Sequence, residues 1–495
     1  MCERLSVVAF CLPKFLALLL FVASPAIAQA QVNQAESESN APTPLATPAS
    51  AASPASVVTQ TASPAPAVST PVPQVSSAVP QSSSQSSEAE SLTQRSMLNA
   101  PHEDDTSAAA VDEPSDAGCG DAIDASYSFG QGVNFKSCDG NYLMHVWSRS
   151  QLRYSLNRVD QPGSNVSQVM EVRRASLFFA GNAFGEHNKY FLQLVFAPRD
   201  VGLTGPAQTS SPIFDMFFTF DYLRDFSLRV GQYKPFFSRQ FIAAWGDLQF
   251  VDRSIAQNEF HLDRDIGFDV FSTDVGGLDL FRYYAGAYVG QGRNSVAPRD
   301  VHFSPVVRFE VLPFGTFDDY KEGDLSRNTT PKLSLGVAYA YLMGVSKANG
   351  VYGPTPLDMG TTNFHELTGD LMFKLMGFSL TGEVYYRRGT RTSGGAVDSM
   401  GMTIATEAAR NGTGYFVQGG YLLPGIPLEF SARGGQVFAI NNSSMLDSGE
   451  VGGALSYYAQ GHPFKIQADY FRSYVGPQTL SSGSDQVRLQ LQMQM

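Results

Sequence analysis

The charged side chains between Tyr233 and Asp265 are the group in this sequence whose types and spacing could do chemistry. Four basic and five acidic residues lie within this one segment. Opposite charges that face each other across a narrow passage create a transverse electric field, which acts on a passing ion without a covalent step. The residues that would form such a constriction are Lys234, Arg239, Asp252, Arg253, Asp263 and Arg264.

A structural role for the same charges is the alternative. Arg253 could pair with Asp252 or Asp263, and Arg264 with Asp265, which would hold the segment in place rather than act on a solute. The sequence does not decide between these roles.

A second charged group alternates with apolar residues along the rest of the chain. Guanidinium groups bind phosphate oxygens in pairs, so a row of arginines would favour that anion. The acidic residues of the same parity nearly balance the basic ones, so we expect at most a modest anion preference. Ion pairing between neighbouring strands is equally compatible with the pattern. The candidates are Arg229, Arg308, Lys332, Lys374, Arg387, Arg433, Lys465 and Arg488 with Glu310, Glu366, Asp370, Glu383, Glu429 and Asp469.

Arg173 and Arg174 are consecutive, and side chains alternate between the two faces of a strand. We therefore expect only one of them to face inward.

Covalent, metal and nucleotide chemistry find little support in the sequence. Its seven histidines are scattered, and Gly290-Gln291-Gly292 is too short to indicate a phosphate-binding loop. The net charge of −12 belongs mostly to the region before Gly140, so the sequence lacks the basic surface that nucleic-acid binding requires. We expect a protein that is not an enzyme and that uses no cofactor and no metal.

The elements that position these charges are two-sided strands. Glu366, Thr368 and Asp370 alternate with Leu367 and Leu371, which is the pattern of a strand with one polar and one apolar face. About sixteen strands follow from this pattern: 142–157, 168–183, 189–197, 212–222, 226–232, 266–273, 278–289, 302–311, 332–342, 362–375, 378–388, 414–423, 427–437, 449–459, 464–473 and 485–494.

The gaps between these strands alternate between short turns and long polar loops. Apart from the N-terminal segment, no apolar run approaches the roughly 20 residues of a membrane-spanning helix, so a membrane would have to be crossed by strands. An even strand number with short turns at one end is typical of an outer-membrane barrel. A soluble β-sandwich, whose strands are shorter, is the alternative. The connection at about 312–331 is the exception, because it is long where a short turn is due.

The N-terminal region divides into three parts. Residues 1–28 have the basic start, apolar run and small-x-small end of a secretory signal peptide. Residues 29–117 are rich in Ser, Ala and Pro, which predicts a disordered spacer in the periplasm, either a plain tether or a segment that binds peptidoglycan or a partner. Residues 118–140 lead into a barrel over 141–495 and contain Cys119 and Cys138, which form a disulfide or remain two unpaired thiols.

Three motifs resemble the porin O and P family. They are Val172-Arg-Arg-Ala-Ser-Leu-Phe-Phe-Ala-Gly181, Leu228-Arg-Val-Gly-Gln-Tyr-Lys-Pro-Phe-Phe-Ser238, and Phe250-Val-Asp-Arg-Ser254 leading to Arg264-Asp-Ile-Gly267. They cover the first half of the barrel; beyond Asn294 the resemblance rests on strand pattern. It implies a sixteen-stranded homotrimer in the lipid of the bacterial outer membrane that passes small hydrophilic solutes, including anions such as phosphate.

The sequence is therefore compatible with two functions of different classes. The first is a pore for small hydrophilic solutes. The second is a structural anchor, in which a narrow or plugged barrel is tethered through the N-terminal spacer. An outer-membrane enzyme would need Ser, His and Asp residues clustered at the rim, and the sequence does not indicate such a cluster.

Overall fold

The computed structural model describes residues 123–159, 166–201, 211–295 and 302–495. The expected signal peptide, the spacer over 29–117 and Cys119 lie outside the described residues. Within the described part, no helix is long and apolar enough to cross a membrane.

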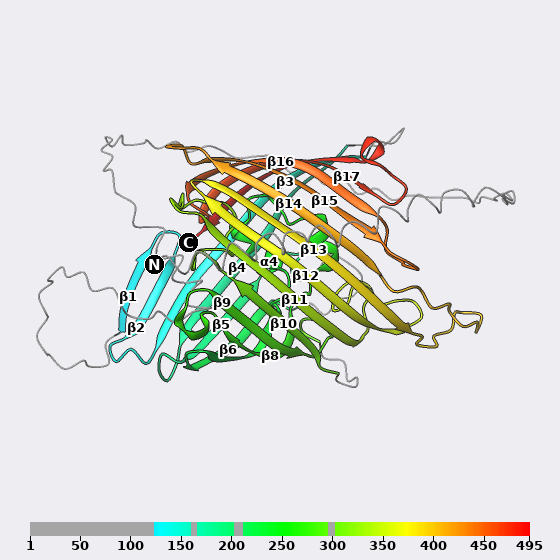
Figure 1. Cartoon of the computed structure of the whole chain (residues 1–495), viewed down its shortest axis with the longest axis horizontal. Helices are drawn as coiled ribbons and strands as arrows, with labels where there is room; N and C mark the ends of the chain where they lie inside the picture. Colours follow the sequence, from blue (N-terminus) through cyan, green and yellow to red (C-terminus); the bar gives the residue numbers. More distant parts are fainter. Residues whose placement is uncertain (1–122, 160–165, 202–210, 296–301) are drawn as a thin grey trace, which may run out of the picture. The chain divides into compact units, whose positions relative to one another are not determined.

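Sixteen antiparallel strands follow one another around a closed barrel (Figure 1). Each strand pairs with the next along the chain, and the last pairs with the first, from Gln494 opposite Arg149 to Ser484 opposite Val159. The predicted all-β barrel is therefore confirmed. Its strands are β3 (Leu143–Val159), β4 (Ser167–Asn182), β5 (Asn188–Val195), β6 (Ile213–Leu223), β7 (Phe226–Tyr233), β8 (Asp265–Ser272), β9 (Phe281–Tyr288), β10 (Ser304–Val311), β11 (Lys332–Val345), β12 (Thr361–Leu375), β13 (Phe378–Thr392), β14 (Gly412–Leu422), β15 (Leu428–Ala439), β16 (Ser448–Gln460), β17 (Phe464–Val475) and β18 (Ser484–Gln494).

The barrel strands carry their polar side chains inside and their apolar side chains outside. Along β18, Gln490 and Gln492 are 1% and 0% exposed, whereas Leu489 and Leu491 are 50% and 40% exposed. Leucines are normally buried in a protein that folds in water. Their exposure here fits an outer face that contacts lipid, with polar side chains turned toward the lumen.

The two ends of the barrel differ in the length of their connections. At one end, β12 and β13 are joined only by Met376 and Gly377, and both residues have positive φ, 51° and 91°, as a two-residue hairpin turn of the primed type requires. At the other end, the connections are longer, as between β13 and β14. Short turns mark the periplasmic end of such barrels, and long loops mark the extracellular end.

A hairpin precedes the barrel and was not predicted as strands. β1 (Ile123–Ser128) pairs with β2 (Gly132–Ser137), and β2 pairs with the first residues of β3, with Val133 opposite Val146. Cys138 follows β2 directly and is disulfide-bonded. Its pairing with Cys119 stays a prediction, because Cys119 is not described.

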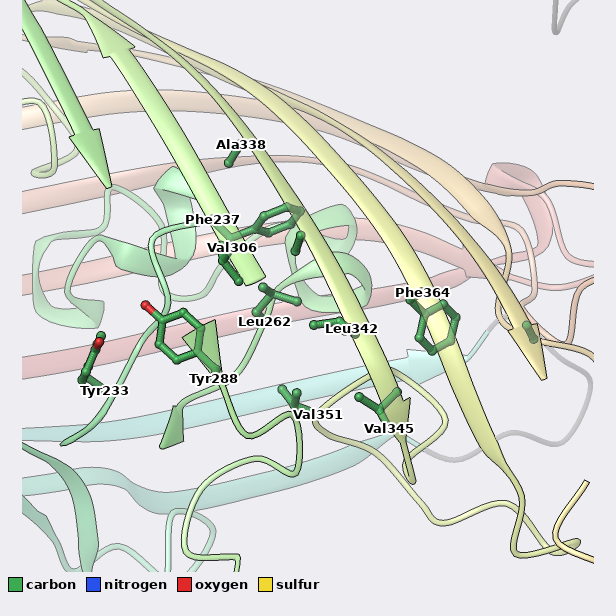
Figure 2. Close-up of a cluster of buried hydrophobic side chains, with 12 residues drawn as sticks. Tyr233, Phe237, Leu262, Tyr288, Val306, Ala338, Leu342, Val345, Val351 and Phe364 are labelled. Carbon is green, nitrogen blue, oxygen red and sulfur yellow. The ribbon is translucent and has the colours of Figure 1, made fainter. Parts of the chain in front are cut away.

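The connection between β7 and β8, residues 234–264, lies inside the barrel and is called the constriction loop below. It contains the short helices α4 (Arg239–Ile242), η1 (Trp245–Asp247) and α5 (Ile255–Phe260). Figure 2 shows Phe237 and Leu262 of this loop beside Val306 of β10 and Leu342 of β11, in one buried cluster. The loop therefore has an apolar core of its own against the inner wall. Two further short helices lie elsewhere in the connections, η2 (Val275–Gly277) and η3 (Leu480–Ser482).

The exceptional connection between β10 and β11, residues 312–331, also turns into the barrel and is called the inner turn below. Asp319 and Glu322 are each 2% exposed, and Glu322 accepts a hydrogen bond of 2.8 Å from the backbone N–H of Gln249 in the constriction loop. The inner turn enters from the short-turn end and meets the constriction loop inside. This contact explains why the connection is long where a short turn is due.

Candidate functional site

A cavity of about 190 Å³ lies along one side of the lumen. Its wall comes from β3 to β7, and the constriction loop and the inner turn close its opposite side. Five basic and two acidic side chains line it: Arg149, Arg229, Lys234, Arg264 and Lys321, with Asp215 and Asp247. Of the twenty predicted pore residues, this cavity brings together Arg229, Lys234 and Arg264.

A buried cluster of arginines and carboxylates anchors the constriction loop to the wall. Arg239 of α4 lies 2.6 Å from Asp370 of β12 and 2.7 Å from Asp319 of the inner turn. Arg308 of β10 lies 2.7 Å from the second carboxylate oxygen of Asp370 and 2.8 Å from Glu310. Arg282 of β9 completes the cluster, 3.0 Å from Asp319. Three positive and three negative charges therefore neutralise one another away from solvent.

Most of the predicted wall cations bind the backbone of an inward segment. Four of them donate to carbonyl oxygens of the constriction loop: Arg308 to Phe237 at 2.8 Å, Arg387 to Glu259 at 2.9 Å, Arg433 to Asp252 at 2.9 Å and Lys465 to Leu248 at 2.7 Å. Lys374 donates to the carbonyl oxygen of Asp318 in the inner turn at 2.7 Å. These contacts hold the inward segments in position.

The remaining wall residues lie in pairs or near the loop. Arg229 pairs with Asp269 at 3.1 Å, and Arg488 pairs with Asp469 at 2.8 Å. Glu383 accepts hydrogen bonds from Ser238 and from the backbone N–H of Gln240, at 2.8 and 2.9 Å. Neither carboxylate oxygen of Glu366 has a hydrogen-bond partner among the described residues.

Asp252 is held by arginines from the first two barrel strands. It lies 3.0 Å from Arg153 of β3 and 3.5 Å from Arg174 of β4. Burial alone would raise the pKa of Asp252, but the charges of Arg153, Arg174 and Arg173 outweigh it and hold the pKa well below its usual value. Asp252 is therefore ionised, and its ion pairs with Arg153 and Arg174 anchor this side of the constriction loop.

The expectation that only one of Arg173 and Arg174 could face inward was wrong. The pairing of β3 with β4 skips a residue, with Gln151 opposite Arg174 and Leu152 opposite Val172. This β-bulge interrupts the alternation: Val172 faces outward, while the side chains of Arg173 and Arg174 are only 17% and 8% exposed and lie beside Asp200 and Asp252, at 3.3 and 3.5 Å.

The local ion pairs expected within the constriction loop also differ from those observed. Arg253 binds backbone carbonyls of its own loop, those of Gln240 at 2.8 Å and Ala243 at 2.7 Å, instead of a carboxylate. Arg264 pairs with Asp215 of β6 at 3.0 Å rather than with Asp265. Asp263 lies 3.8 Å from Arg264. Arg264 therefore ties the constriction loop to the wall, whereas Arg253 holds two parts of the loop together.

Two lysines of the cavity lack a carboxylate partner within ion-pair distance among the described residues. Lys234 donates to the carbonyl oxygens of Phe241 and Ile242, at 2.8 and 3.3 Å, and Lys321 lies on the inner turn. Burial, with the charges of Arg253 and Arg264, lowers the pKa of Lys234 well below its usual value. An anion at this point would favour the charged form of Lys234 again.

The sequence reasoning missed the aromatic side chains of the cavity. Trp147, Phe178, Phe191 and Phe217 come from β3, β4, β5 and β6 and line it together; they are called the aromatic arc below. The signal was present in the sequence. Trp147 lies two positions from the inward Arg149 and Phe178 lies four positions from the inward Arg174, and residues an even number of positions apart in a strand share a face. An aromatic residue on the polar face of a strand marks a lumen position that charge alone does not reveal.

Acidification is expected to loosen the constriction loop near His261. The ring of His261 stacks on Tyr352 with centroids 4.2 Å apart, and burial lowers its pKa to about 4 although Asp263 opposes the shift. The unfolded group titrates near 6.5. The docked loop therefore binds fewer protons in this window, and its stability is complete above pH ~6.5 and falls by up to ~1.4 kcal/mol per pH unit toward pH ~4.

Open-channel current fluctuations at neutral and acidic pH measure this effect. We expect more fluctuations at the lower pH, and a smaller difference in His261→Gln, which cannot take up the proton. Identical fluctuations of the unmodified protein at both pH values would contradict the prediction.

The comparisons with known proteins come from a family model and from solved structures. The model of the family described as phosphate-selective porin O and P matches residues 146–494. Among curated proteins, none matches this chain.

Three solved structures are similar to this chain in fold. The loop L8 deletion mutant of OmpT from Vibrio cholerae is 11% identical, with 71% of this chain and 99% of that chain covered and a TM-score of 0.46. An anion-selective porin from Comamonas acidovorans is 11% identical, with 71% and 100% covered and a TM-score of 0.44. The channel DcaP of Acinetobacter baumannii is 14% identical, with 74% and 100% covered and a TM-score of 0.42.

Proposed function

This chain belongs to the phosphate-selective porin O and P family and is an outer-membrane porin, and from that premise we propose that small hydrophilic solutes diffuse past its constriction loop with a modest preference for anions. The observation that carries the preference is the charge of the cavity, where five basic side chains meet two acidic ones. An excess of one sign in a narrow, low-dielectric passage raises the local concentration of the opposite ion.

The proposal concerns small anions in general rather than phosphate in particular. Most wall arginines bind carboxylates or loop carbonyls, as Arg308 binds Asp370 and Phe237. Their guanidinium groups are therefore occupied, and an uninterrupted row of free arginines is not what the solute meets. Lys234 and Lys321 are the residues that we expect to face it.

The assembly and placement of the chain form part of the same proposal. We place its apolar outer face in outer-membrane lipid and expect a homotrimer, as the family implies. The hairpin of β1 and β2 joins β3 at the end of the barrel with short turns, which is the periplasmic end in such proteins. The spacer over 29–117 would then lie in the periplasm.

A second function is favoured by the two inward segments. The constriction loop and the inner turn meet inside the barrel and bury most of the charged wall. A barrel closed in this way could serve as an anchor, with the spacer linking the outer membrane to the cell wall.

Planar-bilayer recording of the purified full-length protein separates the two functions. A steady ohmic current supports the pore, and silence from correctly folded protein supports the anchor. The reversal potential in a salt gradient then tests the anion preference, and strong cation selectivity would contradict it.

A further inference from the structure

Four aromatic rings form a continuous surface on the inner wall of this porin. The rings of Trp147 and Phe178 are stacked, with centroids 4.9 Å apart and planes 5° apart. Phe191 follows at 6.2 Å from Trp147, and Phe217 lies 5.2 Å from Phe191. The aromatic arc thus crosses four neighbouring strands, on wall positions that elsewhere in this barrel carry polar side chains.

Packing of the rings of the aromatic arc against one another leaves part of their surface exposed. Trp147 and Phe178 are buried, whereas Phe191 and Phe217 keep part of their surface exposed, and all four line the cavity. A cavity of about 190 Å³ exceeds the roughly 150 Å³ of an apolar protein cavity known to accept benzene. There is therefore room for one six-membered ring beside the aromatic arc.

Positive charge borders the same space. Arg229 lies over the ring of Phe217, 5.5 Å from its centroid, and Lys234 and Lys321 line the cavity without carboxylate partners among the described residues. A solute that fills this space meets flat apolar faces on one side and cations on the other.

We propose that the aromatic arc, with Lys234 and Lys321 beside it, is a binding site for small aromatic carboxylates on their way through the barrel. The flat ring of such a solute stacks on the arc, and its carboxylate lies toward the cations. Aromatic pairs prefer offset-stacked or edge-to-face contacts, which a planar ring can make and a puckered saturated ring cannot. The inference rests on the proposed porin function and adds the solute class.

Benzoate and cyclohexanecarboxylate form a matched pair of probes, because they share charge and ring size and differ in planarity. Binding is measured by the change in intrinsic fluorescence of the full-length protein in detergent. The chain contains two tryptophans, Trp147 and Trp245, and both line the cavity. We expect benzoate to bind about tenfold more tightly than cyclohexanecarboxylate, and to block the current through single channels at correspondingly lower concentration.

Two variants on β6 provide the critical comparison. Phe217→Leu removes a ring of the aromatic arc, whereas Phe218→Leu removes the neighbouring ring, which points outward and is 49% exposed. We expect Phe217→Leu to weaken benzoate binding about five- to tenfold with cyclohexanecarboxylate unchanged, and Phe218→Leu to leave both unchanged. Phe191→Leu should behave like Phe217→Leu and repeats the test at a second position.

Each outcome bears on one of the two proposals. Equal affinity for both probes, or equal effects of Phe217→Leu and Phe218→Leu, would overturn the aromatic site while an ohmic current leaves the porin function intact. Ring-selective binding without any current would overturn the porin function and leave the binding site standing.

Discussion

Replacing Arg239 by methionine is expected to raise the single-channel conductance about twofold or more, because it releases the constriction loop from the wall. Arg239 is 1% exposed and lies within 2.7 Å of both Asp370 and Asp319. Without it, the buried cluster keeps three carboxylates against two arginines. Removing one partner from a buried ion pair typically costs about 3–5 kcal/mol. Moving the loop away and admitting water relieves this cost, and the passage widens.

Single-channel recordings of Arg239→Met in planar bilayers measure the effect. Arg224→Met is the matched control, because Arg224 pairs with Asp225 at an exposed turn, where its side chain is 56% exposed. Such surface pairs contribute little, so the control should conduct like the unmodified protein. An unchanged conductance of Arg239→Met in a barrel that still closes would show that the loop is held without this cluster.

Exchanging both Lys234 and Lys321 for glutamate is expected to turn the anion preference into a cation preference. The cavity has five basic and two acidic side chains, and the double variant would have three and four. The sign of the potential in the passage therefore reverses. Because selectivity follows that sign, the reversal potential in a salt gradient should cross zero.

Lys321→Glu alone should move the reversal potential part of the way, which separates the contribution of the inner turn from that of the constriction loop. Lys136→Glu carries the same charge change on the exposed face of β2 and should leave the reversal potential where it was. A double variant that remains anion-selective would place the ion pathway outside this cavity.

The strand pattern could be predicted from the sequence because each barrel strand faces two different solvents. Leu489 must face lipid and Gln490 must face the lumen, so the alternation is complete along β18 and is written directly in the residue types. The even strand number and the ends of most strands follow in the same way. Only β1 and β2 were not predicted. They form a hairpin outside the closed barrel, where a strand need not place lipid on one face and the lumen on the other.

The contacts of the lumen could not be predicted in this way. Parity places Arg308 and Asp370 inside, but it does not tell which of several inward carboxylates an arginine meets across the barrel. The two inward segments decide this, since Arg239 reaches Asp319 in a connection far along the chain. At the β-bulge at Arg173 the strict alternation of inward and outward side chains fails, because a single extra residue changes which side chains share a face.

The barrel is closed only where β18 pairs with β3. Arg149 and Gln494 bond across this seam although 345 positions separate them in the chain. Without the pairing of β18 with β3, the sheet would be a curved ribbon with two open edges, each able to pair with a foreign strand. Closure is thus the most non-local pairing of the barrel, and a chain that lost its final strand would keep both edges open.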